Sequence, residues 1–329
     1  MLHTVHNQGV LAATATYDKN SRPVYTSYGN STDLSLAYDT DRGRENYRSV
    51  TTPSVNPLLS VTNTVYDGQS NITDRTGTFN GVSKDESLAY DPLDRLTSFT
   101  RGMEPTVTWQ YDKAGNWTDT NQNGTAETRT VNDDNEYDLV AGLVPAHDYR
   151  GNMTSDGSKS YVYDWANRLI TVKSGSQTIG SYTYDALNRR VAKTAGGITT
   201  TYVYDDGHVI EEYVNAGLTR SFVYGGGIDE PILMETGGRT YYFAADSLGS
   251  IRAMTDSTGT LVESYEYSPF GLMTVYNGLG QDITISRSAI GNPFGYGTRS
   301  PVSGITGTGC TLRNWEGSCS GIRQGMLTG

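Results

Sequence analysis

The pair Tyr-Asp recurs along this chain far more often than its composition would produce by chance. It begins at Tyr17, Tyr38, Tyr66, Tyr90, Tyr111, Tyr137, Tyr163, Tyr184 and Tyr204. From Tyr163 the spacing becomes regular, because Tyr184, Tyr204 and Tyr224 follow at intervals of 21, 20 and 20 residues. A fixed period in this range marks a repeat architecture, in which stacked units share one continuous core. The sequence therefore predicts an array of small repeats.

Each repeat has the pattern of a β-hairpin. A first run such as Tyr161-Val162-Tyr163 is aromatic and β-branched, as strands prefer. The Asp that follows can accept backbone hydrogen bonds and start a turn, and an Asn, Asp or Gly three residues later tolerates the left-handed conformation of a tight hairpin. The next Arg could lie across a neighbouring Tyr or pair with the turn Asp. The repeat signature that we expect to be structural comprises Tyr90, Asp91, Arg95, Tyr111, Asp112, Gly115, Tyr163, Asp164, Arg168, Tyr184, Asp185, Arg189, Tyr204 and Asp205.

These hairpins predict an all-β fold. A single hairpin is barely stable in water, whereas stacked hairpins share ladder hydrogen bonds and cover one another's edges. The right-handed twist between strands makes a long sheet coil. We therefore expect antiparallel β-hairpin repeats that form a long curling strip, without a helix of ordinary length. Residues 41–62 and 119–147 fit the repeat poorly, and we expect long excursions or degenerate repeats there.

Charge and composition limit the partners and the compartment. A net charge of −11 and an isoelectric point near 4.8 argue against nucleic acid or an anionic membrane as partner. The chain has no stretch of 18 apolar residues, so we predict no transmembrane segment, and its first ten residues show no signal peptide. Cys310 and Cys319 could close a small disulfide loop, but one pair does not define a framework, and their state stays open.

Catalytic groups are sparse. None of the histidines lies in a Ser/His/Asp or metal-ligand spacing; they are His3, His6, His147 and His208. The acidic pairs Asp205-Asp206 and Glu211-Glu212 are better explained as acids of turns and solvated strand faces than as an acid/base pair. Residues 225–227 are glycines without phosphate-loop spacing. We therefore predict that the chain is not an enzyme and needs no cofactor or metal.

A longer motif resembles the RHS/YD-repeat family, which includes rearrangement-hotspot proteins, toxin-complex shells and animal teneurins. The Tyr-Asp-x-x-(Asn/Gly)-Arg-Leu unit carries part of the resemblance, which spans residues 15–299. The stretch from Tyr241 to Gly271 matches the start of the family's core segment more specifically, and Asn292-Pro293-Phe294 resembles the next landmark. The core signature that we expect to be structural comprises Tyr242, Asp246, Leu248, Gly249, Tyr267, Pro269, Phe270 and Gly271.

The resemblance implies four segments. These are an N-terminal lead-in (1–14), the YD-repeat strip (15–235), an incomplete core-like segment (236–299) and a Gly-rich tail (300–329) that we expect to be disordered. After Arg299 the family pattern is lost: no Tyr follows, the self-cleavage pattern is not found, and the one Asp-Pro pair is Asp91-Pro92 inside a repeat. We therefore expect no payload domain in this chain, and a truncated or frameshifted gene near residue 299 stays open.

Family members wind such a strip into a shell around a C-terminal toxin payload or act as surface scaffolds. The resemblance therefore implies a structural shell segment, secreted or associated with the cell surface, whose partners are the rest of the shell or an encapsulated payload. An alternative from another class is a cell-surface carbohydrate-binding or adhesion protein in which exposed Tyr faces engage glycans. Sequons begin at Asn30, Asn71, Asn116 and Asn123, and they matter only in a eukaryotic secretory host.

Overall fold

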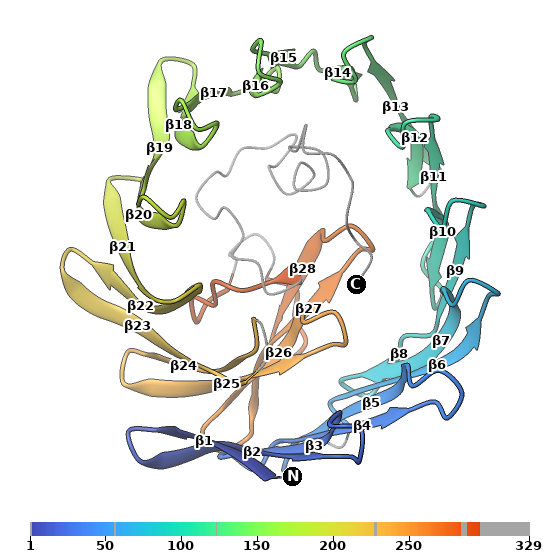
Figure 1. Ribbon diagram of the computed structural model, residues 1–329, viewed down its shortest axis with the longest axis vertical. Coiled ribbons are helices and arrows are strands. Elements are labelled where there is room, and N and C mark those ends of the chain that lie inside the picture. Colours follow the sequence, from blue (N-terminus) through green and yellow to red (C-terminus); the bar gives the residue numbers. More distant parts are fainter. Residues whose placement is uncertain (1, 56, 123, 227–228, 284–287, 297–329) are drawn as a thin grey trace.

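The fold consists of β-strands (Figure 1). The computed structural model describes residues 2–55, 57–122, 124–226, 229–283 and 288–296, and its regular elements there are all strands. The first sheet holds β1 (Leu2–Asn7), β2 (Val10–Tyr17), β3 (Pro23–Tyr28), β4 (Asp33–Tyr38), β5 (Glu45–Thr51), β6 (Leu59–Tyr66), β7 (Ile72–Phe79), β8 (Val82–Ser83), β9 (Glu86–Tyr90), β10 (Leu96–Arg101), β11 (Val107–Tyr111), β12 (Trp117–Gln122), β13 (Thr125–Val131) and β14 (Tyr137–Val140).

The second sheet holds β15 (Ala146–His147), β16 (Met153–Ser155), β17 (Ser160–Tyr163), β18 (Leu169–Ser174), β19 (Gln177–Tyr184), β20 (Arg190–Ala195), β21 (Ile198–Asp205), β22 (His208–Val214), β23 (Gly217–Tyr224), β24 (Pro231–Thr236), β25 (Arg239–Ala245), β26 (Ile251–Asp256), β27 (Leu261–Tyr267) and β28 (Met273–Asn277). Neighbours pair in sequence order, except that β7 pairs with both the short β8 and β9. The predicted all-β hairpin architecture is confirmed.

The two sheets follow one another around a ring (Figure 1). The first runs from β1 at the bottom up the right side, and the second continues from β15 at the top down the left side. No ladder joins β14 to β15 among the described residues, so the expected single strip is divided there. The connection turns sharply, with positive φ at Ala141 and Gly142. It then passes through Pro145, which has no N–H to offer a ladder.

A β-bulge recurs in most repeats directly before the tyrosine. Thr183 pairs with Ala192, whereas the next residue, Tyr184, pairs with Arg190. The same shift precedes Tyr17, Tyr38, Tyr111, Tyr163, Tyr204 and Tyr224. A bulge bends its strand and increases the local right-handed twist. Each repeat thus adds a bend to the curl that sequence reasoning attributed to twist alone.

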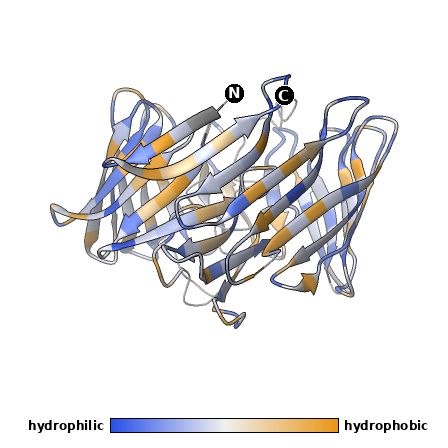
Figure 2. Ribbon diagram, turned by 90° about the horizontal axis from the view of Figure 1, so that it is seen from below, coloured by the Kyte–Doolittle hydropathy of each residue, from blue (hydrophilic) through white to orange (hydrophobic). Residues whose placement is uncertain are grey.

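Part of the core lies where the strip overlaps itself. Strands β24–β27 lie on the inner side of the first strands (Figure 1), and Val50, Leu59 and Phe79 pack there against Ala253 and Leu261. A neighbouring cluster joins Ala12 and Ala13 of β2 to Ile232, Leu233 and Tyr242. The largest cluster lies within the C-terminal strands and includes Met234, Phe243, Met254 and Tyr265. Elsewhere hydrophobic and hydrophilic residues alternate along the strands (Figure 2), as expected for strands buried on one face.

Of the two alternatives expected at 41–62 and 119–147, long excursions are wrong and degenerate repeats remain, because these segments hold the regular strands β5, β13, β14 and β15, most of β12 and the start of β6. Burial under the C-terminal strands helps to account for β5 and β6, because Val50 and Leu59 are fully buried there, and β6 also ends at the Tyr66-Asp67 pair. The lead-in 1–14 contains β1 and the first part of β2. Residues 300–329, with Cys310 and Cys319, lie outside the described residues.

Candidate functional site

The repeat turn is built around its aspartate. Asp91 Oδ1 accepts hydrogen bonds from the backbone N–H groups of Leu93 (2.9 Å) and Arg95 (3.0 Å). Asp91 Oδ2 accepts a bond from Arg95 Nε at 2.6 Å. Asp94 adopts φ of 60°, in the left-handed region expected for this position. The carboxylate therefore binds backbone donors two and four residues on.

The arginine links each turn to the next. The Arg95 guanidinium lies 4.6 Å from the centroid of the Tyr111 ring and donates to the Asp112 carbonyl at 2.9 Å. In return, the Tyr111 hydroxyl donates to the Leu96 carbonyl at 2.6 Å. Sequence reasoning offered a contact with Tyr or with Asp as alternatives, and the structure shows both. We call this arrangement of Asp, Arg and the following Tyr the turn latch.

The turn latch repeats along the strip. Arg168 binds Asp164 and stacks on Tyr184, and Arg189 binds Asp185 and stacks on Tyr204. Two further latches join Asp18, Arg22 and Tyr38, and Asp39, Arg44 and Tyr66. In the turn with Gly115 at φ of 95°, Asn116 replaces the arginine and donates to Asp112 Oδ2 and Asn135 Oδ1. The latch thus fixes the position of each hairpin relative to the next.

The latch also lowers the pKa of its aspartates. The hydrogen bond from the Arg168 guanidinium lowers the pKa of Asp164; partial burial opposes this, and the backbone N–H groups of Arg168 and Ala166 add to the lowering. At Asp39 the hydrogen bond from Arg44 lowers the pKa to about 2. The same direction is found at Asp91, Asp112 and Asp185, where burial is outweighed by hydrogen bonds to the carboxylate.

Not every Tyr-Asp pair starts a turn. Asp205 is the last residue of β21 and pairs with His208 across a turn that contains Asp206 at φ of 49°. Tyr137 comes after its turn, which Asn132 starts by accepting bonds from the N–H groups of Asp134 and Glu136. Turns of the same kind start at Asp148 and Asp256, neither of which follows a tyrosine. The signal that finds them is an Asn or Asp followed three residues later by Gly or Asn.

Polar contacts hold the overlap between the two ends of the strip. Asn30 Nδ2 donates to Thr255 Oγ1 (2.9 Å) and to the Asp256 carbonyl (2.7 Å). Arg101 Nη2 donates to the Tyr267 carbonyl at 2.7 Å. Lys84 lies 2.9 Å from Glu266. Each contact joins residues more than 160 positions apart, so the overlap is a tertiary interface with its own specificity.

A buried carboxylate anchors this charge network. Glu86 binds both Arg75 and Arg101, and Arg101 Nε lies 2.7 Å from its Oε1. Burial favours the neutral form of Glu86, but the charges of Arg75 and Arg101 outweigh it and keep the pKa below its usual value. Removing one partner of such a buried pair leaves an uncompensated charge. The network therefore makes the overlap sensitive to single substitutions.

Residues of the core signature also make contacts between the C-terminal strands and the first sheet. Tyr242 packs edge-on against Tyr28 of β3, where a Cβ added at Gly29 would lie 2.9 Å from the Tyr242 hydroxyl. Tyr267 is buried, donates to the Ile251 carbonyl at 2.7 Å, and has a pKa well above its ordinary value because of burial. Phe270 lies against both Trp109 and Trp117, with ring centroids 5.0 and 4.5 Å apart.

The other members of the core signature shape turns. Asp246 accepts bonds from the N–H groups of Leu248 and Ser250, Gly249 has φ of 76°, and Leu248 is exposed. In the next turn on that rim, Gly271 has φ of 88° and the Pro269 carbonyl accepts a bond from the Tyr296 hydroxyl. The core segment thus continues the repeat geometry and also contacts the first sheet.

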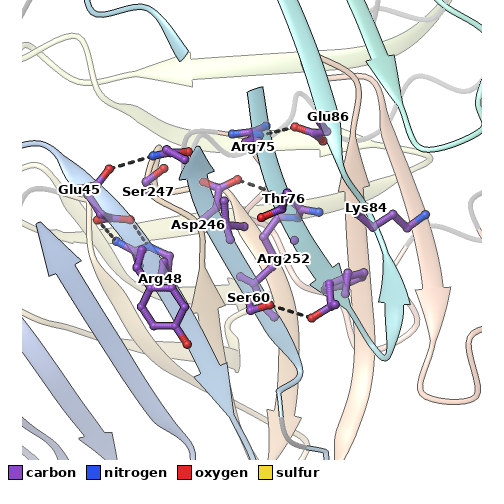
Figure 3. A pocket seen from close by; sticks show the side chains of 17 residues that line it. Glu45, Arg48, Ser60, Arg75, Thr76, Lys84, Glu86, Asp246, Ser247 and Arg252 are labelled. Atoms are coloured by element: carbon purple, nitrogen blue, oxygen red, sulfur yellow. Dashed lines mark hydrogen bonds and ion pairs between the residues drawn. The ribbon is translucent and has the colours of Figure 1, made fainter. Parts of the chain in front are cut away.

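A small polar pocket lies between the layers (Figure 3). Its lining includes Arg48, Arg75, Asp246 and Arg252, and the free volume is about 30 Å³, room for roughly two water molecules. The charged groups pair with one another, as Arg48 does with Glu45. A space of this size does not admit an organic substrate.

The acidic and histidine side chains that the sequence analysis judged non-catalytic each contact a separate partner. Glu212 binds Arg220, while Glu211 accepts a bond from Tyr213 at 2.8 Å. His147 Nδ1 lies 3.7 Å from Glu136, and the His208 ring contacts that of Tyr224. Within the described ranges, no cluster of three His, Cys, Asp or Glu side chains is placed to bind a metal, and no helix is long and apolar enough to cross a membrane.

Sequon asparagines are engaged in contacts. Asn30 is buried in the overlap, Asn71 Nδ2 donates to Asp67 and Asp94, and Asn116 binds Asp112. Asn123 lies outside the described residues. A glycan at Asn30 would require the overlap to open.

A comparison with protein families decides which family shares this architecture. The model of the teneurin YD-shell matches residues 59–280. The chain belongs to the teneurin YD-shell family. The RHS/YD-repeat resemblance noted from the sequence is thereby confirmed.

Curated relatives of this YD shell are much longer proteins. The tRNA nuclease WapA of Bacillus subtilis (strain 168) is 28% identical over 191 residues, which cover 55% of this chain and 8% of WapA. The tRNA(Glu)-specific nuclease WapA of Bacillus subtilis subsp. natto (strain BEST195) is 30% identical over 131 residues, 38% of this chain and 6% of that protein. The chain therefore spans less than a tenth of the length of these relatives.

Solved structures share the fold of the YD shell. TcdB2-TccC3 without its hypervariable C-terminal region gives a TM-score of 0.70 at 16% identity, over 91% of this chain and 18% of that chain. A Photorhabdus luminescens Tc holotoxin pore gives a TM-score of 0.65 at 16% identity, over 83% of this chain and 16% of that chain. At this identity the likeness shows a common fold.

Proposed function

We propose that this chain is a wall segment of a longer shell protein and that the shell encloses a payload. The overlap carries the proposal, because it joins the two ends of the strip through a buried core and paired charges. Such an interface closes the wall on itself without any catalytic group. The turn latch supports the same role, since it fixes each hairpin relative to the next and makes the wall stiff.

Related proteins support enclosure as the purpose of the wall. The solved relatives are toxin assemblies, and one is described as lacking its hypervariable C-terminal region. The WapA relatives are named as tRNA nucleases, yet the match covers 8% or less of their length. We propose that this chain supplies the wall and that any toxic activity resides elsewhere in the whole protein. The whole protein would then be exported or displayed at the cell surface.

The experiment uses the product of the complete coding sequence, obtained by reading the DNA on both sides of this segment. Limited proteolysis of that product should leave a payload intact while the wall is closed. Substituting Arg101→Ala, which removes the bonds to Glu86 and to the Tyr267 carbonyl, should expose the payload to the protease. Substituting Arg42→Ala on an exposed turn is the matched control. A payload cleaved equally in all three proteins would refute enclosure.

Catalysis by the chain itself is tested separately. The purified chain should leave tRNA uncut and its own backbone intact during prolonged incubation. Either cleavage of tRNA or self-processing would contradict the proposed structural role.

Carbohydrate binding through the repeat tyrosines is the alternative that the sequence left open. The structure gives these rings other partners: Arg95 stacks on Tyr111, and the Tyr184 hydroxyl donates to the Leu169 carbonyl. We therefore favour the structural role over glycan binding by these faces. A glycan array with Tyr111→Phe and Tyr184→Phe variants tests the alternative, and binding that either variant loses would support it.

A further inference from the structure

A short segment after the last strand lies along the second sheet without joining its ladders. It runs from Ser288 to Tyr296, and we call it the strap. The strap contains no charged residue, and its Pro293 has no N–H to offer a ladder. Among the described residues, it makes one backbone hydrogen bond to a strand, from the Ile251 N–H to the Gly295 carbonyl at 3.1 Å. Contacts with side chains therefore hold most of the strap in place.

One buried carboxylate binds the start of the strap. Glu263 of β27 is 1% exposed, and its Oε1 accepts hydrogen bonds from the backbone N–H groups of Ala289 (2.5 Å) and Ile290 (3.1 Å). Its Oε2 accepts bonds from the hydroxyl groups of Ser288 (2.7 Å) and Tyr265 (2.5 Å). Hydrogen bonds to a charged acceptor are stronger than those between neutral groups, so Glu263 is the main polar anchor of the strap.

An aromatic pocket binds the far part of the strap. The Phe294 ring meets the rings of Phe222 and Phe243 edge-on, with centroids 5.1 and 5.4 Å apart. Between the two ends, the Arg220 guanidinium lies against Gly291, where an added Cβ would be 2.6 Å from Arg220 Nη2. We call the surface that binds the strap the strap groove; its side chains are Arg220, Phe222, Phe243, Glu263 and Tyr265.

The strap groove and the overlap lie on opposite faces of the same strands. Successive residues of a strand point to opposite sides, so Phe243 faces the groove, whereas its neighbour Ala244 packs in the overlap against the first strands. Strands β25 and β26 pair at five registered positions, none of which involves the strap. Departure of the strap would therefore leave these ladders and the overlap in place. Local opening of this kind breaks few contacts and needs much less free energy than global unfolding.

We propose that the strap and the strap groove form a reversible clasp. The strap leaves the groove and returns to it as one unit while the strands stay paired, and the empty groove binds an uncharged peptide with the same order of groups. That peptide supplies a hydroxyl and two successive N–H groups to Glu263, a glycine against Arg220, and a phenylalanine to the aromatic pocket. The proposal is independent of payload enclosure, because the overlap stays closed while the clasp is open.

Hydrogen exchange of the wild-type chain tests whether the clasp opens by itself. Exchange in the peptide that contains Ala289 and Ile290 should not change at low urea concentrations, because opening of the strap exposes little surface. Exchange in β25 to β27 should accelerate with urea, because their amides exchange through a larger unfolding. Strap amides that respond to urea as strongly as those of β26 would overturn the proposal.

Two substitutions loosen the clasp from its two ends. Glu263→Gln removes the charge of the acceptor and should speed exchange of the strap about tenfold, and Phe294→Ala empties the aromatic pocket and should speed it at least about a hundredfold. Exchange in β5 and β6, under the overlap, should stay as in the wild type. Leu279→Ala, which removes an exposed side chain from the turn after β28, is the matched control and should change neither region. Equal acceleration of the strap and of β5 would show that these residues support the whole fold instead of a clasp.

A fluorescein-labelled peptide with the sequence of residues 288–296 tests the groove as a binding site. In fluorescence anisotropy it should bind the Phe294→Ala chain at least about tenfold more tightly than the wild-type chain, whose own strap competes for the groove. Adding Glu263→Gln to the Phe294→Ala chain should weaken this binding about tenfold, and a peptide with alanine in place of its phenylalanine should not bind. Equal binding to the wild-type and Phe294→Ala chains, or binding to neither, would reject the strap groove as a peptide site.

Discussion

At the scale of single residues, one arginine stabilises two hairpins. Arg168 closes its own turn through Asp164 and covers the ring of Tyr184 in the next repeat. A lysine would keep the charge, but it lacks the planar group that can stack on the ring and bond at several points together. This explains why the sequence places Arg, rather than Lys, after the left-handed residue in the regular repeats.

Replacing Arg168 by Ala should lower the free energy of unfolding by about 1–2 kcal/mol, through loss of the stacking and of the turn bonds. Arg168→Lys should recover less than half of this loss. Urea unfolding followed by fluorescence measures both. Arg239→Ala, at an exposed position that begins β25, is the control and should have little effect. Equal losses at the two positions would contradict the latch.

The depressed pKa values of the turn aspartates predict acid sensitivity. A carboxyl group whose pKa is lowered in the folded state contributes stability that is present above its unfolded value near 3.8 and disappears as the pH falls through the folded value. The double variant Asp164→Asn, Asp185→Asn should keep the turns, because Asn132 starts the same turn.

We expect this double variant to be less stable than the wild type at neutral pH and to approach it between about pH 5 and about pH 2. Urea midpoints measured across this range follow the difference. A constant difference at all pH values would show that the turn aspartates do not titrate as the latch requires.

At the scale of elements, the hairpin of β27 and β28 reaches across the ring. Its turn residue Phe270 lies between Trp109 and Trp117 on β11 and β12, where it joins the last strands to the far part of the first sheet. Sequence analysis named Phe270 as structural, but it could not find the partner, because the two segments are more than 150 residues apart.

Substituting Phe270→Ala should destabilise the chain by about 2–3 kcal/mol, somewhat less than for a fully buried phenylalanine. The fluorescence of Trp109 and Trp117 should shift to longer wavelength as water reaches them. Leu272→Ala, two residues further along the same hairpin and partly exposed, is the matched control. An unchanged tryptophan spectrum in Phe270→Ala would refute this docking.

The sequence predicts those features of the fold that depend only on residues within one hairpin. The strand patterns, the turn aspartates and the left-handed Asn167 and Asn188 follow from local chemistry, and the structure places them as expected. The overlap does not follow, because contacts such as Asn30 with Asp256 have no local signature. At Tyr137 a local signature misleads instead. The Tyr-Asp pair predicts a turn after Tyr137, but the turn lies before it and is started by Asn132.

At the scale of the whole molecule, stability is distributed unevenly. The C-terminal strands, together with the overlap that they form with the first strands, hold the largest buried side chains, including Leu59, Met254 and Tyr265. The junction of the sheets is weakly connected: β16 and β17 share one registered pair, Ser155 with Ser160, and no ladder joins β14 to β15 in the described structure. The ring therefore combines a densely packed region with a junction that few backbone hydrogen bonds hold together.

Hydrogen exchange should reveal this difference. Backbone amides in residues 141–160 should exchange fastest among the segments of the wall, and those of β25 to β27 should exchange slowest, since local opening follows buried contacts. Mass spectrometry of exchanged peptides measures both regions in one experiment. Uniform exchange along the strip would contradict the proposed division.

The overlap also determines when the chain can finish folding. Strands β5 to β7 leave the ribosome before the residues that cover them, such as Ala253 and Leu261, which are made about 200 residues later. At a synthesis rate of about 5–20 residues per second, Val50 and Leu59 wait roughly 10–40 s with their apolar face uncovered. The apolar face of these strands therefore stays exposed during synthesis, and it can make contacts with other chains until the C-terminal strands cover it.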